Sequence, residues 1–175
     1  MATKQITAEM VKALREETEA GIMDCRRALE QADGDMQKAK QILREKGIAS
    51  AGKKAERETK QGLVEAYIHG GGRIGSLVEL NCETDFVART DQFKQLAREV
   101  AMQVAAKSPR FLSKDEVTAE QRVDLSDKEI EAMSLLSQPY IRDESKTIEQ
   151  LIKETIATTG ENIRVGRFAR FELGR

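Results

Sequence analysis

The segment Thr84-Asp85-Phe86-Val87 places an aromatic side chain directly after an acid, at the point where a strand-like pattern gives way to a helical one. The chain contains only five Phe, two Tyr and no Trp. A Phe at such a junction either packs into the core, which is the commoner role, or anchors a binding partner. Rigid aromatic side chains are typical interface hot spots. The residues alone leave both roles open.

The other residues that could do chemistry form no catalytic pattern. His69 is the only histidine, and no recognisable partner for acid–base catalysis accompanies it. Cys25 and Cys82 lie far apart, without the paired spacing of a metal or redox site, so we expect two reduced, buried thiols. The carboxylates alternate with Lys and Arg, as on solvated helix faces. We therefore expect no enzyme active site, no cofactor and no metal.

The charge balance indicates which partners to expect. The 175 residues include 29 Lys and Arg against 30 Asp and Glu, whereas proteins that bind a phosphate backbone usually carry a basic excess. The N-terminus leads directly into an amphipathic helix, and no long apolar stretch follows anywhere. We expect a cytoplasmic protein that works by binding, without direct contact to nucleic acid or membrane.

Regular elements on both sides should position the Thr84–Val87 segment. In residues 74–82 alternate side chains can face a core, as in a half-buried strand: Ile74, Ser76, Val78, Leu80 and Cys82. Thr90 or Asp91 is then a good N-cap for a helix with apolar residues at helical spacing. The segment is therefore predicted to be a strand-to-helix junction.

The chain is predicted to divide near residue 60. Residues 1–48 should form a three-helix domain whose third helix begins after Asp35 and ends at Lys46-Gly47. Residues 49–61 are small and charged, which is typical of a linker, and residues 62–175 should form a second domain.

The second domain is predicted to be a small antiparallel three-stranded sheet with helices on one face, which makes the chain an α+β protein. Its first two strands should form a hairpin across the glycine-rich loop 69–73. A later helix should end at Gly160, and the last strand should carry a bulge at Gly166, where the alternation changes phase.

Two longer segments carry a family resemblance. Residues 19–29, Glu-Ala-Gly-Ile-Met-Asp-Cys-Arg-Arg-Ala-Leu, and residues 81–89, Asn-Cys-Glu-Thr-Asp-Phe-Val-Ala-Arg, closely resemble bacterial elongation factor Ts. The resemblance extends from Thr7 to Val165. It implies a guanine nucleotide exchange factor that binds elongation factor Tu and promotes GDP release, with an N-terminal domain of the ubiquitin-associated type.

The resemblance also implies residue roles. Asp85 and Phe86, within the motif that includes Thr84 and Val87, would wedge between helices of the GTPase domain and disturb the magnesium and phosphate end of the nucleotide site. Ile22 and Met23 would contact that domain near the base-binding side. A non-catalytic adaptor built on a ubiquitin-associated-like bundle is the alternative, and it would bind without affecting nucleotide release.

The chain also resembles a short form of the family. Larger members carry a doubled core, whereas this sequence has one core unit, so we expect a homodimer that restores the arrangement. The apolar residues of the last strand are expected to supply the contact: Ile163, Val165, Phe168 and Phe171.

Overall fold

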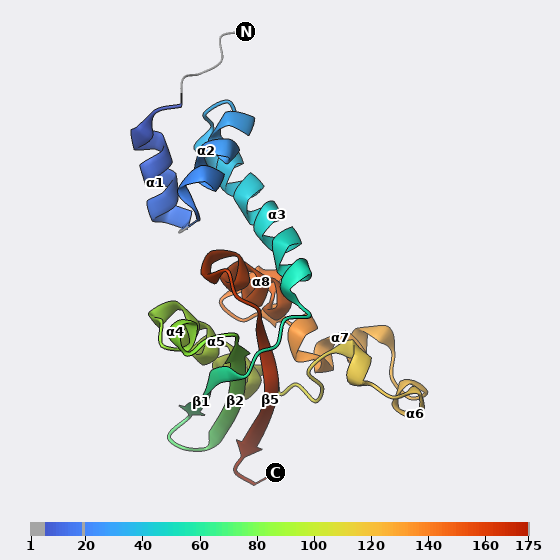
Figure 1. The fold of residues 1–175 in the computed structure, drawn as a ribbon. Coiled ribbons are helices and arrows are strands. Elements are labelled where there is room, and N and C mark those ends of the chain that lie inside the picture. The colour runs from blue at the N-terminus through green and yellow to red at the C-terminus, as the bar shows by residue number, and fades with distance from the viewer. Residues whose placement is uncertain (1–5, 19, 175) are drawn as a thin grey trace.

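The computed structural model describes residues 6–18 and 20–174, which form a helical bundle and a mixed α/β core joined by one long helix (Figure 1). Residues 1–5 and 19 of the predicted first domain lie outside the described residues. The predicted α+β class is confirmed. No helix among the described residues combines the length and apolar character that a membrane span requires.

The bundle consists of α1 (Ala8–Thr18), α2 (Ile22–Gln31) and the first half of α3 (Met36–Lys54). The predicted cap is present, because the Asp35 carboxylate accepts hydrogen bonds from the backbone N–H groups of Gln37 (2.9 Å) and Lys38 (3.0 Å). A small apolar cluster fills the interior: Leu14, Cys25, Ala28, Leu29, Ala32 and Ala39. So small a core depends on further contacts for stability.

The predicted end of the third helix at Gly47 is wrong, because α3 continues to Lys54 and includes residues 49–54 of the predicted linker. The reason is packing against α8 (Ile148–Thr159). A Cβ atom on Gly47 would lie only 2.5 Å from the Cβ of Ala157, so the glycine allows the two helices to approach closely. Arg44 also pairs with Glu154 of α8 at 2.8 Å. The division into domains stays a prediction, but α3 links the two parts continuously.

The sheet has the antiparallel order β1 (Gln61–His69), β2 (Ile74–Cys82) and β5 (Ile163–Glu172). The predicted hairpin is confirmed, and its loop glycines, Gly70, Gly71 and Gly72, adopt positive φ angles. The predicted bulge is also confirmed. Because Glu79 lies opposite Arg167 and Leu80 opposite Val165, Gly166 is the extra residue in β5.

The inner face of the sheet packs against α5 (Asp91–Lys107), with α8 completing the core (Figure 1). The alternation predicted for residues 74–82 is confirmed, since Val78, Leu80 and Cys82 are fully buried. From α5, Phe93 and three other apolar side chains meet them without solvent exposure: Ala97, Val100 and Val104. The Ser76 hydroxyl donates to the Ala101 carbonyl of α5 at 2.7 Å.

The outer face of the sheet is apolar around Leu77 but polar toward the other end, where Glu79 pairs with Arg167 at 2.8 Å, and no helix packs over it in the described chain. Leu77 of β2 lies at its centre, opposite Ala66 of β1 and Ala169 of β5. Three large side chains surround this row and are exposed: Val64, Ile68 and Phe171. Of the last-strand residues expected at a dimer contact, only Phe171 faces outward. Ile163 and Val165 are buried and Phe168 packs on the core, because the bulge at Gly166 changes the phase of the strand and places these residues on its inner face.

The segment between α5 and α8 contains the helices α6 (Ala119–Arg122) and α7 (Asp127–Met133). It also contains a two-stranded ribbon of β3 (Pro139–Tyr140) and β4 (Asp143–Thr147), and this ribbon was not predicted from the sequence. Buried polar groups of α5 hold the ribbon. The amide of Gln103 donates to the Pro139 carbonyl at 3.1 Å, and the Tyr140 hydroxyl donates to Glu99 at 2.6 Å. Burial, followed by this bond to Glu99, raises the pKa of Tyr140 to about 12.

The close approach of α3 and α8 predicts opposite effects for two glycines of one helix. Gly47→Ala should lower the free energy of unfolding by about 1–3 kcal/mol, because its methyl group meets Ala157 and forces the helices apart. Gly52→Ala should raise it by up to about 1 kcal/mol, because no atom lies within 4 Å of the added Cβ and alanine favours the helix. Urea denaturation measures both; equal stability of the two variants would contradict the packing assignment.

Candidate functional site

The Thr84–Val87 segment forms a tight turn between β2 and α5. Its single helical turn, α4 (Asp85–Ala88), begins after Thr84, whose hydroxyl accepts from the Val87 N–H at 3.4 Å. Thr90 then caps α5 by accepting from the Phe93 N–H at 3.3 Å. The predicted strand-to-helix junction is therefore confirmed, and two caps in sequence define its path.

The helical turn has a buried side and an exposed side. Val87 packs against the main core and Ala88 is buried, whereas the Phe86 side chain is 79% exposed. Phe86 is therefore not a core residue, which excludes the first of the two roles considered for it. A large apolar side chain held in water by its backbone is a candidate contact residue.

Asp85 lies at the start of α4, where a carboxylate is favoured by the helix dipole. It pairs with Arg89 at 2.8 Å, one helical turn further along. Both side chains are well exposed, so the pair contributes little to stability. Its groups remain accessible to a partner beside Phe86.

Hydrogen bonds with residues that the sequence analysis did not assign to the turn hold it in place. Glu161, just after α8, accepts hydrogen bonds from the backbone N–H groups of Glu83 (3.2 Å) and Thr84 (3.0 Å). It also accepts from the Thr84 hydroxyl at 2.6 Å. The Cys82 thiol donates to the Thr84 carbonyl at 3.1 Å, and burial, together with the charge of Glu161, raises the pKa of Cys82 to about 11. Cys82 is thus a neutral structural thiol at neutral pH.

Ile22 and Met23 form a second exposed apolar patch, at the start of α2. Their exposed fractions are 56% and 59%. They border a shallow groove of about 290 Å³ between α1 and α2, which three cationic residues also line: Lys12, Arg15 and Arg26. The structure does not bring this patch together with Phe86 into one site, because the two lie on different parts of the molecule. In Figure 1, however, α1 and α4 lie on the same side of α3.

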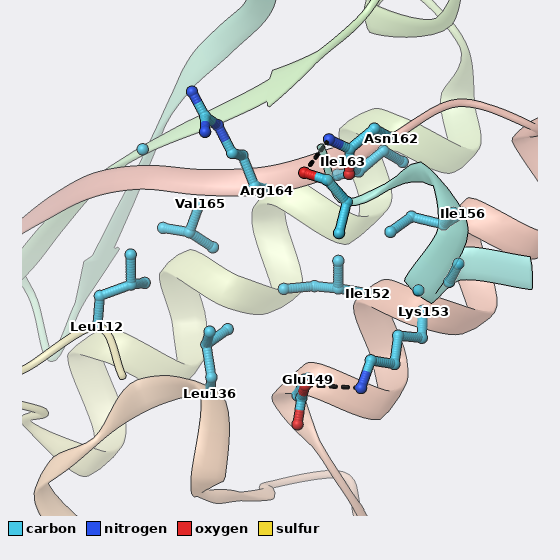
Figure 2. A pocket seen from close by; sticks show the side chains of 14 residues that line it. Leu112, Leu136, Glu149, Ile152, Lys153, Ile156, Asn162, Ile163, Arg164 and Val165 are labelled. Carbon is cyan, nitrogen blue, oxygen red and sulfur yellow. Dashed lines mark hydrogen bonds and ion pairs between the residues drawn. The ribbon is translucent and has the colours of Figure 1, made fainter. Parts of the chain in front are cut away.

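Figure 2 shows an apolar pocket of about 540 Å³ among the end of α3, α8 and the start of β5. Leu112, Leu136 and Ile152 form much of its wall. Two of its charged residues, Glu149 and Lys153, pair with each other at 2.6 Å. The lining therefore has no converging set of free acid, base or metal-binding groups.

Chemistry at other places has little support in the described chain. Within residues 6–18 and 20–174, no group of three or more His, Cys, Asp or Glu residues could hold a metal ion. His69 lies exposed at the end of β1, where its ring stacks on Tyr67 and its Nδ1 atom lies 3.3 Å from the tyrosine oxygen. Cys25 and Cys82 are both free and buried, as predicted. The exposed apolar residues Phe86, Ile22 and Met23 stay the candidates for a functional site.

Comparison with known proteins shows the family of the chain. A family model described as elongation factor TS matches residues 2–125. The chain belongs to the elongation factor Ts family. It is 50% identical to elongation factor Ts of Carboxydothermus hydrogenoformans over 194 aligned residues, which cover 97% of this chain and 89% of that protein. Elongation factor Ts of Thermotoga maritima is 49% identical over 193 residues, covering 97% of both chains.

Family membership confirms the resemblance noted from the two motifs, and it identifies the chain as a translation elongation factor. The individual roles of Thr84, Asp85, Phe86 and Val87 stay predictions. Those of Ile22 and Met23 do too. The structure adds that Phe86, Ile22 and Met23 are accessible, whereas Val87 packs on the core, and that Phe86 is held on a short, capped turn.

Proposed function

We propose that the chain is a guanine nucleotide exchange factor for elongation factor Tu, which promotes GDP release by inserting Phe86 beside the magnesium and phosphate end of the nucleotide site. The observation that carries the proposal is the exposed Phe86 on a turn fixed at both ends, in a member of the elongation factor Ts family. No bond is made or broken, so the activity requires no catalytic constellation.

A rigid wedge can promote release because a bound nucleotide depends on an ion and a phosphate loop whose geometry tolerates little displacement. A partner state that accommodates Phe86 binds nucleotide weakly. By linkage, bound nucleotide weakens the contact with Phe86 by the same factor. Asp85, at the N-terminus of α4, adds a carboxylate at the same position. GTP then completes the exchange by mass action.

The bundle supplies a second contact in this proposal, through Ile22 and Met23 near the base-binding side of the same GTPase domain. The groove beside them combines apolar walls with cationic residues, which suits an apolar partner side chain with acidic neighbours. Because α3 is continuous, the two contact surfaces are linked by a helix rather than by a flexible segment. A second contact made by a linked surface raises the overall affinity.

We also propose that the chain forms a homodimer through the outer face of its sheet. Among the described residues, helices cover the inner face alone, and the outer face presents a row of Ala66, Leu77 and Ala169 flanked by larger apolar side chains, with the Glu79–Arg167 pair beside it. Exposed apolar patches of this kind mark interaction sites. Two copies of one sheet face can pack against each other about a two-fold axis, the commonest symmetry of protein dimers.

Phe86→Ala should slow the release of fluorescent GDP from elongation factor Tu by about 30-fold or more, because an aromatic hot spot is lost. The fold should be unaffected, since the side chain is 79% exposed. Stopped-flow fluorescence measures the release, and Val123→Ala is the control because it truncates an exposed apolar side chain far along the sequence, beside α6. Full activity of Phe86→Ala would exclude the wedge; a wild-type chain without activity would favour the adaptor.

Replacing both Ile22 and Met23 by Asp should weaken binding to elongation factor Tu by about 10- to 100-fold, because the change places charge in an apolar contact. Calorimetry measures the affinity. The matched control replaces Gln37 and Gln41, both exposed on α3, by Asp and so adds the same charge. An affinity loss of equal size in the control would mean that net charge, rather than the patch, is responsible.

Light scattering at micromolar concentration should give twice the 19.6 kDa mass of the chain. Leu77→Asp, at the centre of the outer face, and Phe171→Asp, at its end, should each lower the measured mass, because a charge on this face opposes association. Val123→Asp should leave it unchanged. A monomeric wild-type chain across this concentration range is the result that contradicts the dimer.

A further inference from the structure

The Phe86 turn cannot hold its own orientation. The helix α4 has four residues, and so short a helix is unstable without external contacts. Phe86 itself contributes no packing, because its side chain is mostly exposed. Its direction must therefore come from the residues just before and after it. Val87 and Ala88 pack inward on one side of the turn, and hydrogen bonds fix the other side.

Those hydrogen bonds converge on one carboxylate from the far end of the chain. One oxygen of Glu161 accepts from the backbone N–H groups of Glu83 and Thr84, and the other accepts from the Thr84 hydroxyl. The same hydroxyl caps α4 by accepting from the Val87 N–H. Glu161 thus sets the rotamer of the residue that starts the helical turn carrying Phe86.

Segments 83–84 and 161–162 each accept hydrogen bonds from the other, and the network extends to the end of α3. The Glu83 carboxylate accepts from the Asn162 N–H at 2.6 Å and from Arg57 at 3.4 Å. The buried Asn162 side chain, which Figure 2 labels, donates to the carbonyls of Ala55 (3.2 Å) and Arg57 (2.8 Å), just after the end of α3. Three chain segments therefore meet beneath the turn: 55–57, 83–84 and 161–162.

We infer that Glu161 is a positioning residue for nucleotide exchange: it acts through Thr84 to hold Phe86 in the orientation that enters the partner. The inference rests on the proposed function. A charged acceptor makes stronger hydrogen bonds than a neutral one, and here a single carboxylate meets three donors. A side chain held in its bound orientation loses less conformational freedom on binding, which strengthens the contact.

The first experiment compares two substitutions of Glu161 in the stopped-flow assay of GDP release. Glu161→Ala removes all three acceptor contacts and should reduce exchange about tenfold or more. Glu161→Gln should stay within about threefold of wild type, because its amide oxygen can accept from the backbone N–H groups while its NH₂ donates to the Thr84 hydroxyl. Glu149→Ala is the matched control, since it removes a paired carboxylate of α8 away from the turn.

A double-mutant cycle separates positioning from general stability. In a Phe86→Ala background, Glu161→Ala should reduce exchange by less than about twofold, because the side chain that it positions is absent. A further tenfold loss in that background would show that Glu161 acts independently of Phe86 and would overturn the inference.

Amide hydrogen exchange supplies a readout that does not require the partner. In Glu161→Ala the amides of Glu83 and Thr84 should exchange at least about tenfold faster, while those of the β2–β5 ladder keep their protection. If Glu161→Ala unfolds, Glu161→Asp takes its place, because it keeps the charge and withdraws the carboxylate by one methylene.

The outcomes separate the two proposals. An active wild-type chain with an equally active Glu161→Ala variant overturns the inference and leaves the exchange function intact. A wild-type chain that leaves GDP release unchanged overturns the proposed function and this role of Glu161 with it. Unchanged amide protection in Glu161→Ala excludes the positioning contact regardless of activity.

Discussion

The packing of α5 across the inner face of the sheet determines where the other features lie. It buries Phe93 against the strand that ends at Cys82, so the chain must reverse direction within the eight residues between the two elements. That reversal is the turn that carries Phe86. Because Val87 and Ala88 pack into the same core, Phe86 is left on the exposed side of the helical turn. The exposed aromatic is a consequence of the core, and it needs no contact of its own.

The elements of the core were predictable because they follow simple periodicities. Alternation gave β2, and the change of parity at Gly166 gave the bulge. The helix α3 was predicted too short, because Gly47 resembles a helix end in sequence. The glycine is required instead by the close contact with Ala157, which lies more than a hundred residues later in the sequence. The ribbon of β3 and β4 was missed because β4, Asp-Glu-Ser-Lys-Thr, shows no apolar alternation, and because the ribbon is held at β3 by buried polar groups of α5.

In the candidate site, too, some features follow from neighbouring residues and others depend on residues far away in the sequence. The location of Phe86 at a junction follows from the patterns on either side, but its exposure depends on the three-dimensional path of the turn. Glu161 could not be assigned to the turn, because its partner Thr84 lies 77 residues away and one sequence contains no signal for that pairing. The one local hint is that two polar residues, Glu161 and Asn162, lie between the Gly160 cap of α8 and the buried start of β5. Polar groups at such a position need hydrogen-bond partners.

The continuity of α3 changes how the two contact surfaces work together. A flexible linker would let the bundle search a wide volume and would leave its contact nearly independent of the turn. Here α3 packs on α8 through Gly47, and the segment after its end accepts hydrogen bonds from Asn162, which also donates to Glu83 beside the turn. The bundle and the turn therefore share an anchor at residues 161–162. Under the proposed function, a partner that displaced the bundle would strain this shared anchor, which lies next to the hydrogen bonds between Glu161 and the turn that carries Phe86.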